Sequence, residues 1–254
     1  KIECNFLCLE IKFLCLSNVI FNQLNKNLNK NQLSIKNIFC SSYVKSLDYN
    51  NLFDNFDKKV FLDIGYKKTS ITIFSKKKLI FFNCIPIGGH HITSDISQVL
   101  KITKEDSEAI KLNFSESYAI FSEKTNKEPA VDLKINKKLG QSISIDLLEK
   151  VIFARIDEIL NLCFKNINFS SIVNDKKNIL IFIGEGSKIL HSNSIYLKDE
   201  FNFISEMNFF EENNKKICMS GYNFNNKNNI HEVKVVSKKL KKTGFFEKLF
   251  HFFN

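Results

Sequence analysis

Residues 61–74, Phe-Leu-Asp-Ile-Gly-Tyr-Lys-Lys-Thr-Ser-Ile-Thr-Ile-Phe, decide the fold of this chain. The apolar run over 60–64 predicts a buried strand that stops at a glycine, and the alternation over 70–74 predicts a second strand. A third apolar run, over 79–85, follows a turn made of lysines. Consecutive strands joined by such short polar turns pair with one another, so we predict an antiparallel meander.

The segments around the meander carry helical and strand patterns in turn. Residues 144–165 have the longest helical periodicity, and acidic residues at 105–108 mark the start of a helix over 105–113, where the helix macrodipole favours them. Thr93 or Ser94 would cap a helix over 92–100. The remaining predictions are a helix over 15–29, a short buried strand over 35–40, mixed polar sequence over 42–56, strand and turn over 117–140, a buried strand over 178–183, a helix start at 218–221 and a linker over 222–237.

Two of the predicted strands end at glycine turns of a kind that can face an anion. Asp63, Ile64 and Gly65 lie in a hairpin where a glycine lets backbone N–H groups approach a phosphate and an aspartate holds a hydrated cation. The strand over 178–183 ends at Gly184-Glu185-Gly186-Ser187, a second turn of a type that contacts nucleotides. Both turns equally suit ordinary strand ends, and the residues alone leave the two interpretations open.

The net charge of +10 raises the question of a nucleic-acid partner. Proteins that read nucleic acid rely heavily on arginine, and Arg155 is the single arginine of the chain. From His231 to the C-terminus, six lysines stand against two glutamates, so much of the excess charge lies beside the chain end. The pattern favours a lipid surface and argues against a nucleic-acid binder.

The seven cysteines and the paired histidines indicate no metal centre. No two cysteines have CxxC spacing, so we expect reduced, mostly buried thiols. His90 and His91 have only Asp95 at ligand spacing, and a turn at Gly88 and Gly89 accounts for their position. No serine–histidine–aspartate set for nucleophilic catalysis is visible, so we expect no catalytic residue and no metal ligand.

The end of the chain, Leu240-Lys-Lys-Thr-Gly-Phe-Phe-Glu-Lys-Leu-Phe-His-Phe-Phe-Asn254, has the pattern of an amphipathic helix. Phe246, Leu249, Phe250 and Phe253 fall at i, i+3, i+4 and i+7 and would share one face. Lysines precede this face, and a basic, aromatic helix at a chain end suits the surface of an anionic membrane. The alternative is a C-terminal helix that docks on its own domain.

The order of these motifs resembles one family. Residues 61–74 resemble the second phosphate loop of the actin-like ATPases, and residues 85–96 resemble the segment that follows it in the bacterial cell-division protein FtsA. Residues 105–111 look like that family's adenosine-side helix, and residues 181–187 stand where the family has its glycine-rich adenosine loop. The basic, phenylalanine-rich C-terminus is similar to the membrane-targeting helix of FtsA, whereas MreB and PilM share only the early motifs.

The resemblance implies an α/β, actin-like (ribonuclease-H-like) fold, mainly the second lobe, plus a C-terminal amphipathic helix. The implied domains are a remnant of the FtsA-specific subdomain at 1–34, the inner subdomain of the second lobe at 35–104 and 179–230, the outer subdomain at 105–178, a linker at 231–243 and a membrane-targeting helix at 244–254.

The resemblance also implies the residues of three sites. For a nucleotide, ATP with Mg, they are Asp63, Gly65, Lys67, Lys68, Thr69, Glu108, Lys111, Gly184, Gly186 and Ser187. For the membrane they are Phe245, Phe246, Lys248, Leu249, Phe250 and Phe253. For the C-terminal peptide of FtsZ they are Arg155 and Glu158, although the residues alone favour a solvated ion pair along one helix.

The chain departs from the family pattern in two ways. The first phosphate loop and most of the first lobe, which precede these motifs in the family, are missing, so the resemblance is to an N-terminally truncated member. Gly65-Tyr66-Lys67-Lys68 replaces the family's glycine run, although a lysine there could supply charge to a phosphate, and Glu185 would repel phosphate if it pointed inward. We therefore expect ATP and Mg binding to be weakened or lost in this chain, with at most weak ATPase activity in the intact protein.

The implied function is that of a cell-division adaptor, which tethers FtsZ filaments to the inner membrane and assembles into actin-like polymers at the septum. The implied partners are the FtsZ C-terminal peptide, further copies of the chain, other division proteins and an anionic membrane surface, but no nucleic acid. The implied location is the cytoplasmic face of the bacterial inner membrane, as a peripheral protein at the division site. The alternative is another actin-like ATPase, either an assembly protein like MreB or PilM or a sugar-kinase-like enzyme.

Overall fold

The computed structural model describes residues 13–75, 77–122, 144–165, 167, 177–191 and 204–228. The expected linker over 231–243 and the expected membrane helix over 244–254 lie outside these residues. The same holds for the implied membrane residues Phe245, Phe246, Lys248, Leu249, Phe250 and Phe253.

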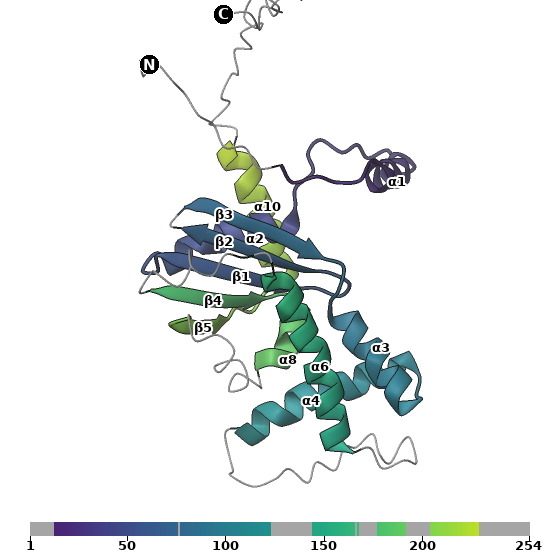
Figure 1. Cartoon of the computed structure of the whole chain (residues 1–254). Helices are drawn as coiled ribbons and strands as arrows, with labels where there is room; N and C mark the ends of the chain where they lie inside the picture. Colours follow the sequence, from purple (N-terminus) through teal and green to yellow (C-terminus); the bar gives the residue numbers. More distant parts are fainter. Residues whose placement is uncertain are drawn as a thin grey trace, which may run out of the picture.

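A five-stranded mixed sheet forms the centre of the fold (Figure 1). Its strands are β1 (Lys58–Ile64), β2 (Thr69–Ser75), β3 (Lys78–Ile85), β4 (Asn178–Ile183) and β5 (Glu206–Phe209), in the spatial order β3-β2-β1-β4-β5. Antiparallel pairing of β1 with β2 and of β2 with β3 confirms the predicted meander. β4 lies parallel to β1, and β5 lies parallel to β4. The register pairs Asp63 with Ile183, so the turns after β1 and β4 leave the sheet side by side.

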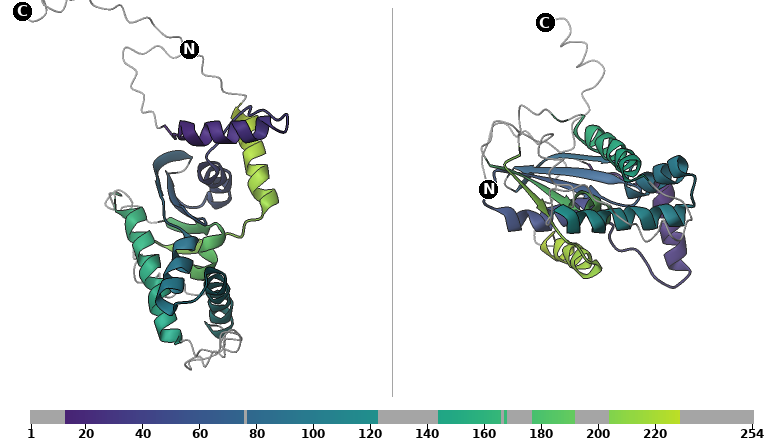
Figure 2. Two further views of the ribbon diagram at one scale, coloured as in Figure 1. Left: turned by 90° about the vertical axis from the view of Figure 1, so that its right-hand side faces the viewer. Right: turned by 90° about the horizontal axis from the view of Figure 1, so that it is seen from below.

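Helices cover both faces of this sheet (Figure 2). They are α1 (Asn18–Asn29), α2 (Ser41–Tyr49), α3 (Gly89–Leu100), α4 (Lys104–Ser122), α6 (Ile145–Phe164), α8 (Lys188–His191) and α10 (Asn214–Asn228), with 3-10 turns η1 (Asn50–Phe53) and η2 (Glu185–Ser187). α3, α4, α6 and α8 pack on the face that carries Val60 and Leu62. α2 and η1 cover the opposite face, where Phe61 points, and α10 lies against α2.

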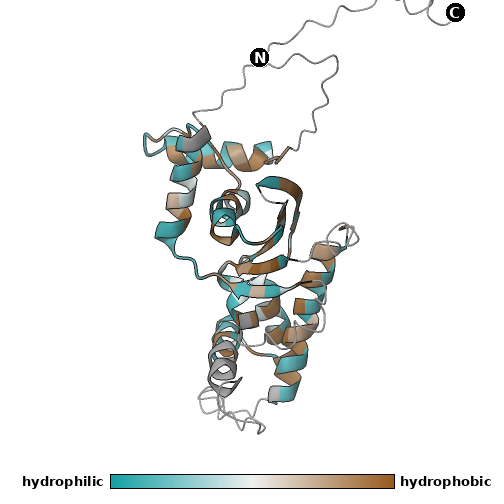
Figure 3. Ribbon diagram, turned by 90° about the vertical axis from the view of Figure 1, so that its left-hand side faces the viewer, coloured by the Kyte–Doolittle hydropathy of each residue, from teal (hydrophilic) through white to brown (hydrophobic). Residues whose placement is uncertain are grey.

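The strand sequences explain why both faces need cover. Successive side chains of a strand point to opposite faces, and in β1 both sets are apolar apart from Asp63 and the two lysines at its start. β4 is apolar after Asn178 and buried along its whole length, as expected for a strand between parallel neighbours. Hydrophobic residues accordingly run along the strands in Figure 3. β3 is the edge strand of the meander and is mostly half-buried.

α1 stands apart from the sheet (Figures 1 and 2). The Ser17 side chain accepts a hydrogen bond from the Val19 N–H and so caps the helix. No residue of α1 is buried, and apolar side chains such as Val19 and Leu24 are 64% and 45% exposed. The helix predicted over 15–29 is confirmed, but within the described residues it contributes nothing to the core.

The other long helices also match their predictions, with different ends. α6 confirms the helix over 144–165, and the helix expected over 105–113 is the first half of α4, which continues to Ser122 through residues expected to be strand and turn. α3 confirms the helix over 92–100, but it begins at Gly89, so the predicted cap at Thr93 or Ser94 is wrong. The His91 ring caps it instead, because its Nδ1 accepts the Gly88 N–H at 3.1 Å.

Two predictions around α2 and α10 are wrong. Residues 35–40 form no strand; they are exposed or half-buried and lie against α10, where Phe39 makes an edge contact with Phe224. The mixed polar segment over 42–56, for which no element was predicted, contains most of α2, whose buried side includes Lys45 and Ser46. α10 begins at Asn214 and includes residues 222–228, which were expected to be a linker.

The cysteines are less buried than expected. Of the five described, only Cys163 is buried; Cys40 is half-buried, and Cys15, Cys84 and Cys218 are exposed. Cys84 lies on the edge strand β3, which explains its exposure. Separately, none of the helices within the described ranges has the length and apolar character needed to cross a bilayer.

Candidate functional site

Five of the eight glycines of the chain meet where β1, β4 and α3 come together. They are Gly65, Gly88, Gly89, Gly184 and Gly186, and we call this contact the glycine junction. A Cβ atom on Gly88 would lie 2.8 Å from the Lys68 nitrogen, and one on Gly186 would lie 2.8 Å from the Ile64 oxygen. Three turns therefore touch backbone to backbone, with no room for side chains between them.

The first turn of α3 is bonded to the turn after β1. The N–H of Gly89 donates to the Gly65 oxygen at 2.9 Å, and the N–H of His90 donates to the Tyr66 oxygen at 2.7 Å. Amide groups at a helix N-terminus commonly bind anions because they lack partners inside the helix. Here these two amides already have partners within the protein, so they are not open to a phosphate.

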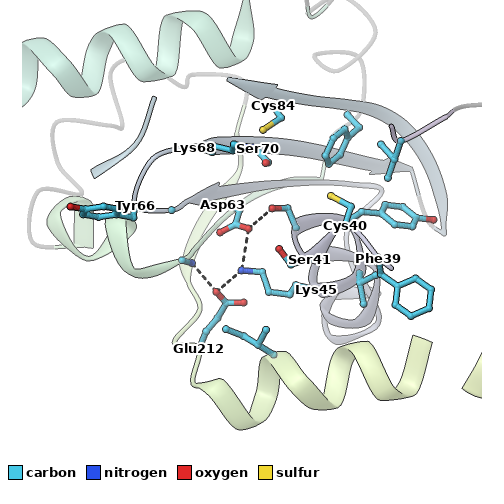
Figure 4. A pocket seen from close by; sticks show the side chains of 18 of the residues that line it. Phe39, Cys40, Ser41, Lys45, Asp63, Tyr66, Lys68, Ser70, Cys84 and Glu212 are labelled. Atoms are coloured by element: carbon cyan, nitrogen blue, oxygen red, sulfur yellow. Dashed lines mark hydrogen bonds and ion pairs between the residues drawn. The ribbon is translucent and has the colours of Figure 1, made fainter. Parts of the chain in front are cut away.

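Asp63 belongs to a buried charged cluster on the α2 face of the sheet (Figure 4). The Lys45 ammonium lies 3.1 Å from Asp63 Oδ2 and 2.9 Å from Glu212 Oε2. Asp63 also accepts the Ser42 hydroxyl at 2.6 Å, and Glu212 accepts the Gly184 N–H at 2.9 Å. Burial alone lowers the pKa of Lys45, but the two carboxylates outweigh it and raise that pKa above the ordinary value.

A cavity of about 1070 Å³ opens beside this cluster. Lys45, Asp63 and Glu212 line it, together with Lys67 and Lys68 from the turn after β1. The two turn lysines are exposed, and neither forms an ion pair with a carboxylate in the described part of the chain. The cavity thus combines a buried cluster, in which one ammonium offsets one of two carboxylates, with exposed lysines at its rim.

A second cluster reaches the junction from the opposite face. The Lys111 ammonium lies 2.7 Å from Glu108 Oε2, 2.9 Å from Thr93 Oγ1 and 3.2 Å from the Gly89 oxygen, and the Thr93 hydroxyl donates to Glu108. Burial alone raises the pKa of Glu108, but the hydrogen bonds from Lys111 and Thr93 outweigh it and lower that pKa below 4.5. The structure therefore brings Glu108 and Lys111, both implied nucleotide contacts, to the glycine turns.

Two further implied nucleotide residues, Thr69 and Ser187, have hydrogen-bond partners within the protein. Thr69 is fully buried and donates its hydroxyl to the Ile87 oxygen at 2.7 Å. Ser187 donates its hydroxyl to the Gly184 oxygen at 2.7 Å. Glu185 also lines the cavity, but its side chain is 75% exposed and lies 2.6 Å from the Lys188 ammonium, so its charge is paired.

Arg155 bridges two helices. Its guanidinium grips Asp95 of α3 through two bonds, Nε to Oδ2 at 2.6 Å and Nη2 to Oδ1 at 2.9 Å, and its Nη1 donates to Glu158. The hydrogen bond with Asp95 is the main cause that raises the pKa of Arg155. The ion pair along α6 was expected from the spacing, whereas the bidentate contact to Asp95 was not.

The paired histidines sit at the start of α3. The rings of Tyr66 and His90 lie 4.8 Å apart between centroids. Burial, and next the positive charge of Lys104, lower the pKa of His90. Across the described residues there is no group of three or more histidine, cysteine or acidic side chains able to hold a metal ion.

Sequence reasoning missed Ser42, Lys45 and Glu212. Ser42 and Lys45 share a face of α2 by their i, i+3 spacing, but the helix itself was not predicted. Glu212 follows β5, and its place is set by the bond from the Phe210 N–H to the Phe182 oxygen at 2.9 Å. No local sequence signal links residues so far apart in the chain.

Solved structures share this fold at low identity. MreB5 of Spiroplasma citri bound to AMPPNP matches with a TM-score of 0.60 and 16% identity over 85% of this chain and 67% of that one. The PilM–PilN type IV pilus biogenesis complex matches with a TM-score of 0.52 and 14% identity over 74% of this chain and 46% of that one. These likenesses confirm the actin-like α/β fold.

Sequence relatives are more specific. The cell division protein FtsA of Streptococcus pneumoniae is 26% identical over 141 residues, which are 56% of this chain and 30% of that protein. FtsA of Enterococcus faecalis is 33% identical over 103 residues, 40% of this chain and 22% of that protein. The chain thus spans less than a third of the length of these relatives. The family model for cell division protein FtsA matches residues 60–191, just over half of the chain and including all five glycines of the junction. The chain therefore belongs to the FtsA family of actin-like cell-division proteins.

Proposed function

We propose that this chain is part of a cell-division adaptor that tethers FtsZ filaments to the cytoplasmic face of the inner membrane and assembles into actin-like polymers at the septum. The observation that carries the proposal is the FtsA family match over 60–191. Residues 105–178 would form the outer subdomain that holds the FtsZ peptide, and residues 244–254 would hold the membrane. The inner subdomain, at 35–104 and 179–230, would contribute the nucleotide turns.

The proposed peptide contact centres on Arg155 and Glu158. Arg155 is 24% exposed and already carries a carboxylate partner in Asp95, which shows that its fork can hold such a group and that a peptide carboxylate would have to compete for it. The test is fluorescence anisotropy with a labelled FtsZ C-terminal peptide. Arg155→Ala should weaken binding about tenfold, near 1.4 kcal/mol.

Lys150→Ala is the matched control for that measurement. Lys150 lies on the same helix and is 72% exposed in an ion pair with Asp146. Its replacement therefore removes an equal charge from α6 and leaves Arg155 in place. Equal affinities for wild type and Arg155→Ala would show that the peptide binds elsewhere.

The proposed membrane contact is tested by deleting residues 244–254. The full chain should pellet with anionic vesicles and remain in solution with neutral ones, because both apolar burial and lysine charge contribute. The deleted chain should stay in solution with either vesicle. Unchanged pelleting of the deleted chain with anionic vesicles would contradict the assignment of this segment.

The proposed nucleotide is ATP, and the support is the meeting of Gly65, Gly184, Gly186, Glu108 and Lys111 at one point. Binding should be weak in this chain, since the amides at the start of α3 are already bonded. A fluorescent ATP analogue titrated into wild type and Lys111→Met measures this contact. Turnover of the intact protein faster than about 1 per second would favour an enzyme over an adaptor.

A further inference from the structure

The two carboxylates around Lys45 could be ligands of a cation, but the space between them is already occupied by the lysine ammonium group. Two carboxylates, Asp63 and Glu212, present oxygens 3.1 and 2.9 Å from one buried ammonium nitrogen. Mg²⁺ needs oxygen ligands at about 2.0–2.1 Å in octahedral geometry. The facing oxygens of Asp63 and Glu212 instead lie at hydrogen-bond distances from the Lys45 nitrogen, which occupies the space between them. A metal ion placed between them would lie against the ammonium group, so these residues do not fit Mg²⁺ while Lys45 is present.

We infer that Lys45 is a built-in cation that takes the place of a divalent metal ion at the Asp63 turn. The side chain is held for this task from three directions. Ser42, one turn earlier on α2, donates to the same Asp63 oxygen at 2.6 Å. The Gly184 N–H fixes Glu212 at 2.9 Å, so β1, the β4 turn and the segment after β5 all converge on one nitrogen.

With Lys45 in place of a metal ion, lysines supply all the positive charge of the cavity. Lys45 offsets one of its two carboxylate partners, and Lys188 offsets Glu185 at the neighbouring turn. The exposed Lys67 and Lys68 then leave the turn end of the cavity with a positive excess that needs no metal. A phosphate-bearing ligand would meet lysine ammonium groups here, and its binding would not depend on Mg²⁺.

The inference is tested by replacing Lys45 and measuring whether a divalent metal ion restores the thermal stability that the variant has lost. Lys45→Met leaves two buried carboxylates without their cation, which should lower the Tm of the full chain in EDTA by about 6–20 °C. The same two carboxylates then become ligands for a divalent ion, so Mn²⁺ should restore several degrees to the variant. The wild-type Tm should be the same in EDTA, Mg²⁺ and Mn²⁺.

Lys59→Met is the matched control. Lys59 is at least as buried as Lys45, but its ammonium lies 3.3 Å from a single carboxylate, Asp54, which is 63% exposed. This variant should lose stability without any recovery in Mn²⁺. If Lys45→Met does not yield folded protein, Mn²⁺ binding to wild type, followed by electron paramagnetic resonance, tests the same point, because Lys45 should exclude the ion.

Two results would overturn the inference. One is Mn²⁺ or Mg²⁺ binding by wild type that Asp63→Asn abolishes. The other is a Lys45→Met variant whose loss of Tm is identical with and without Mn²⁺. None of these measurements uses nucleotide, vesicle or peptide, so a failure of the adaptor function would leave their outcome unchanged.

Discussion

Replacing Gly184 with alanine tests how closely the turns of the glycine junction pack. Gly184 has φ 83° and ψ 153°, a region that residues with a Cβ scarcely enter. An added Cβ would also lie 2.6 Å from both Asp63 Oδ1 and the Ile64 oxygen. Backbone strain of about 1–3 kcal/mol and overpacking of about 1–3 kcal/mol give a loss of about 2–6 kcal/mol in the free energy of unfolding.

Thermal and urea denaturation of Gly184→Ala measure that loss. For a domain of this size each kcal/mol shifts Tm by about 2–4 °C, so the Tm should fall by about 4–24 °C. Gly221→Ala is the control, because Gly221 lies inside α10 with nothing within 4 Å of an added Cβ. It should gain about 0.5–1 kcal/mol from helix propensity. A Gly184→Ala variant as stable as Gly221→Ala would refute the packing described for the junction.

Further predictions concern the thiols, the acid limb of stability and the contact between α3 and α6. Burial raises the pKa of Cys163 to about 12, so at mildly alkaline pH a thiol reagent should label the exposed Cys218 and leave Cys163 unmodified by mass spectrometry; labelling of both at one rate would contradict the packing of α6. Since the folded pKa of Glu108 is lowered, its stabilisation is present above the ordinary carboxyl value of 4.5 and is lost as the pH falls through the folded value; Glu108→Gln should flatten the fall in Tm over that range, and an unchanged acid limb would argue against the Lys111 contact. Asp95→Asn should cost about 1–2 kcal/mol in urea unfolding, because it halves a bidentate ion pair that is about one quarter exposed; a double-mutant cycle with Arg155 that shows no coupling would exclude that pair.

The meander could be predicted because its physics is local. In β1, β2 and β3 the apolar alternation and the short polar turns decide both the strands and their pairing. The long apolar stripe of α6 and the acidic start of α4 are equally local signals. In each case the spacing of apolar residues within the element also indicates which of its faces is buried.

Elements with polar buried faces could not be predicted in this way. α2 hides Lys45 and Ser46, and α10 hides Ser220, so neither shows an apolar stripe. The apolar residues over 35–40 suggested a strand, yet Phe39 is used to contact Phe224 of α10. In these elements the structure depends on contacts between side chains that are far apart in sequence, and the periodicity of apolar residues gives no information about such contacts.

The residues of the candidate site likewise fall into those with a local sequence signal and those without one. Gly65, Gly184 and Gly186 were identified because glycines at strand ends are a local signal, and the structure places them in contact with one another's turns. Lys45 and Glu212 could not be identified, since they come from two segments far apart in the chain and meet only when the sheet assembles. Asp95 was likewise weighed as a metal ligand, whereas its partner proved to be an arginine sixty residues away.

The hydrogen bonds between the first turn of α3 and the turn after β1 make these two segments one mechanical part. A change in the path of residues 65–68 would either move the start of α3 or break the two short backbone bonds that join them. α3 is in turn joined to α6 by the ion pair between Asp95 and Arg155. The turn region at the cavity rim is thereby joined to α6 by two backbone hydrogen bonds and one bidentate ion pair, so its place relative to α6 is fixed by polar contacts as well as by apolar packing.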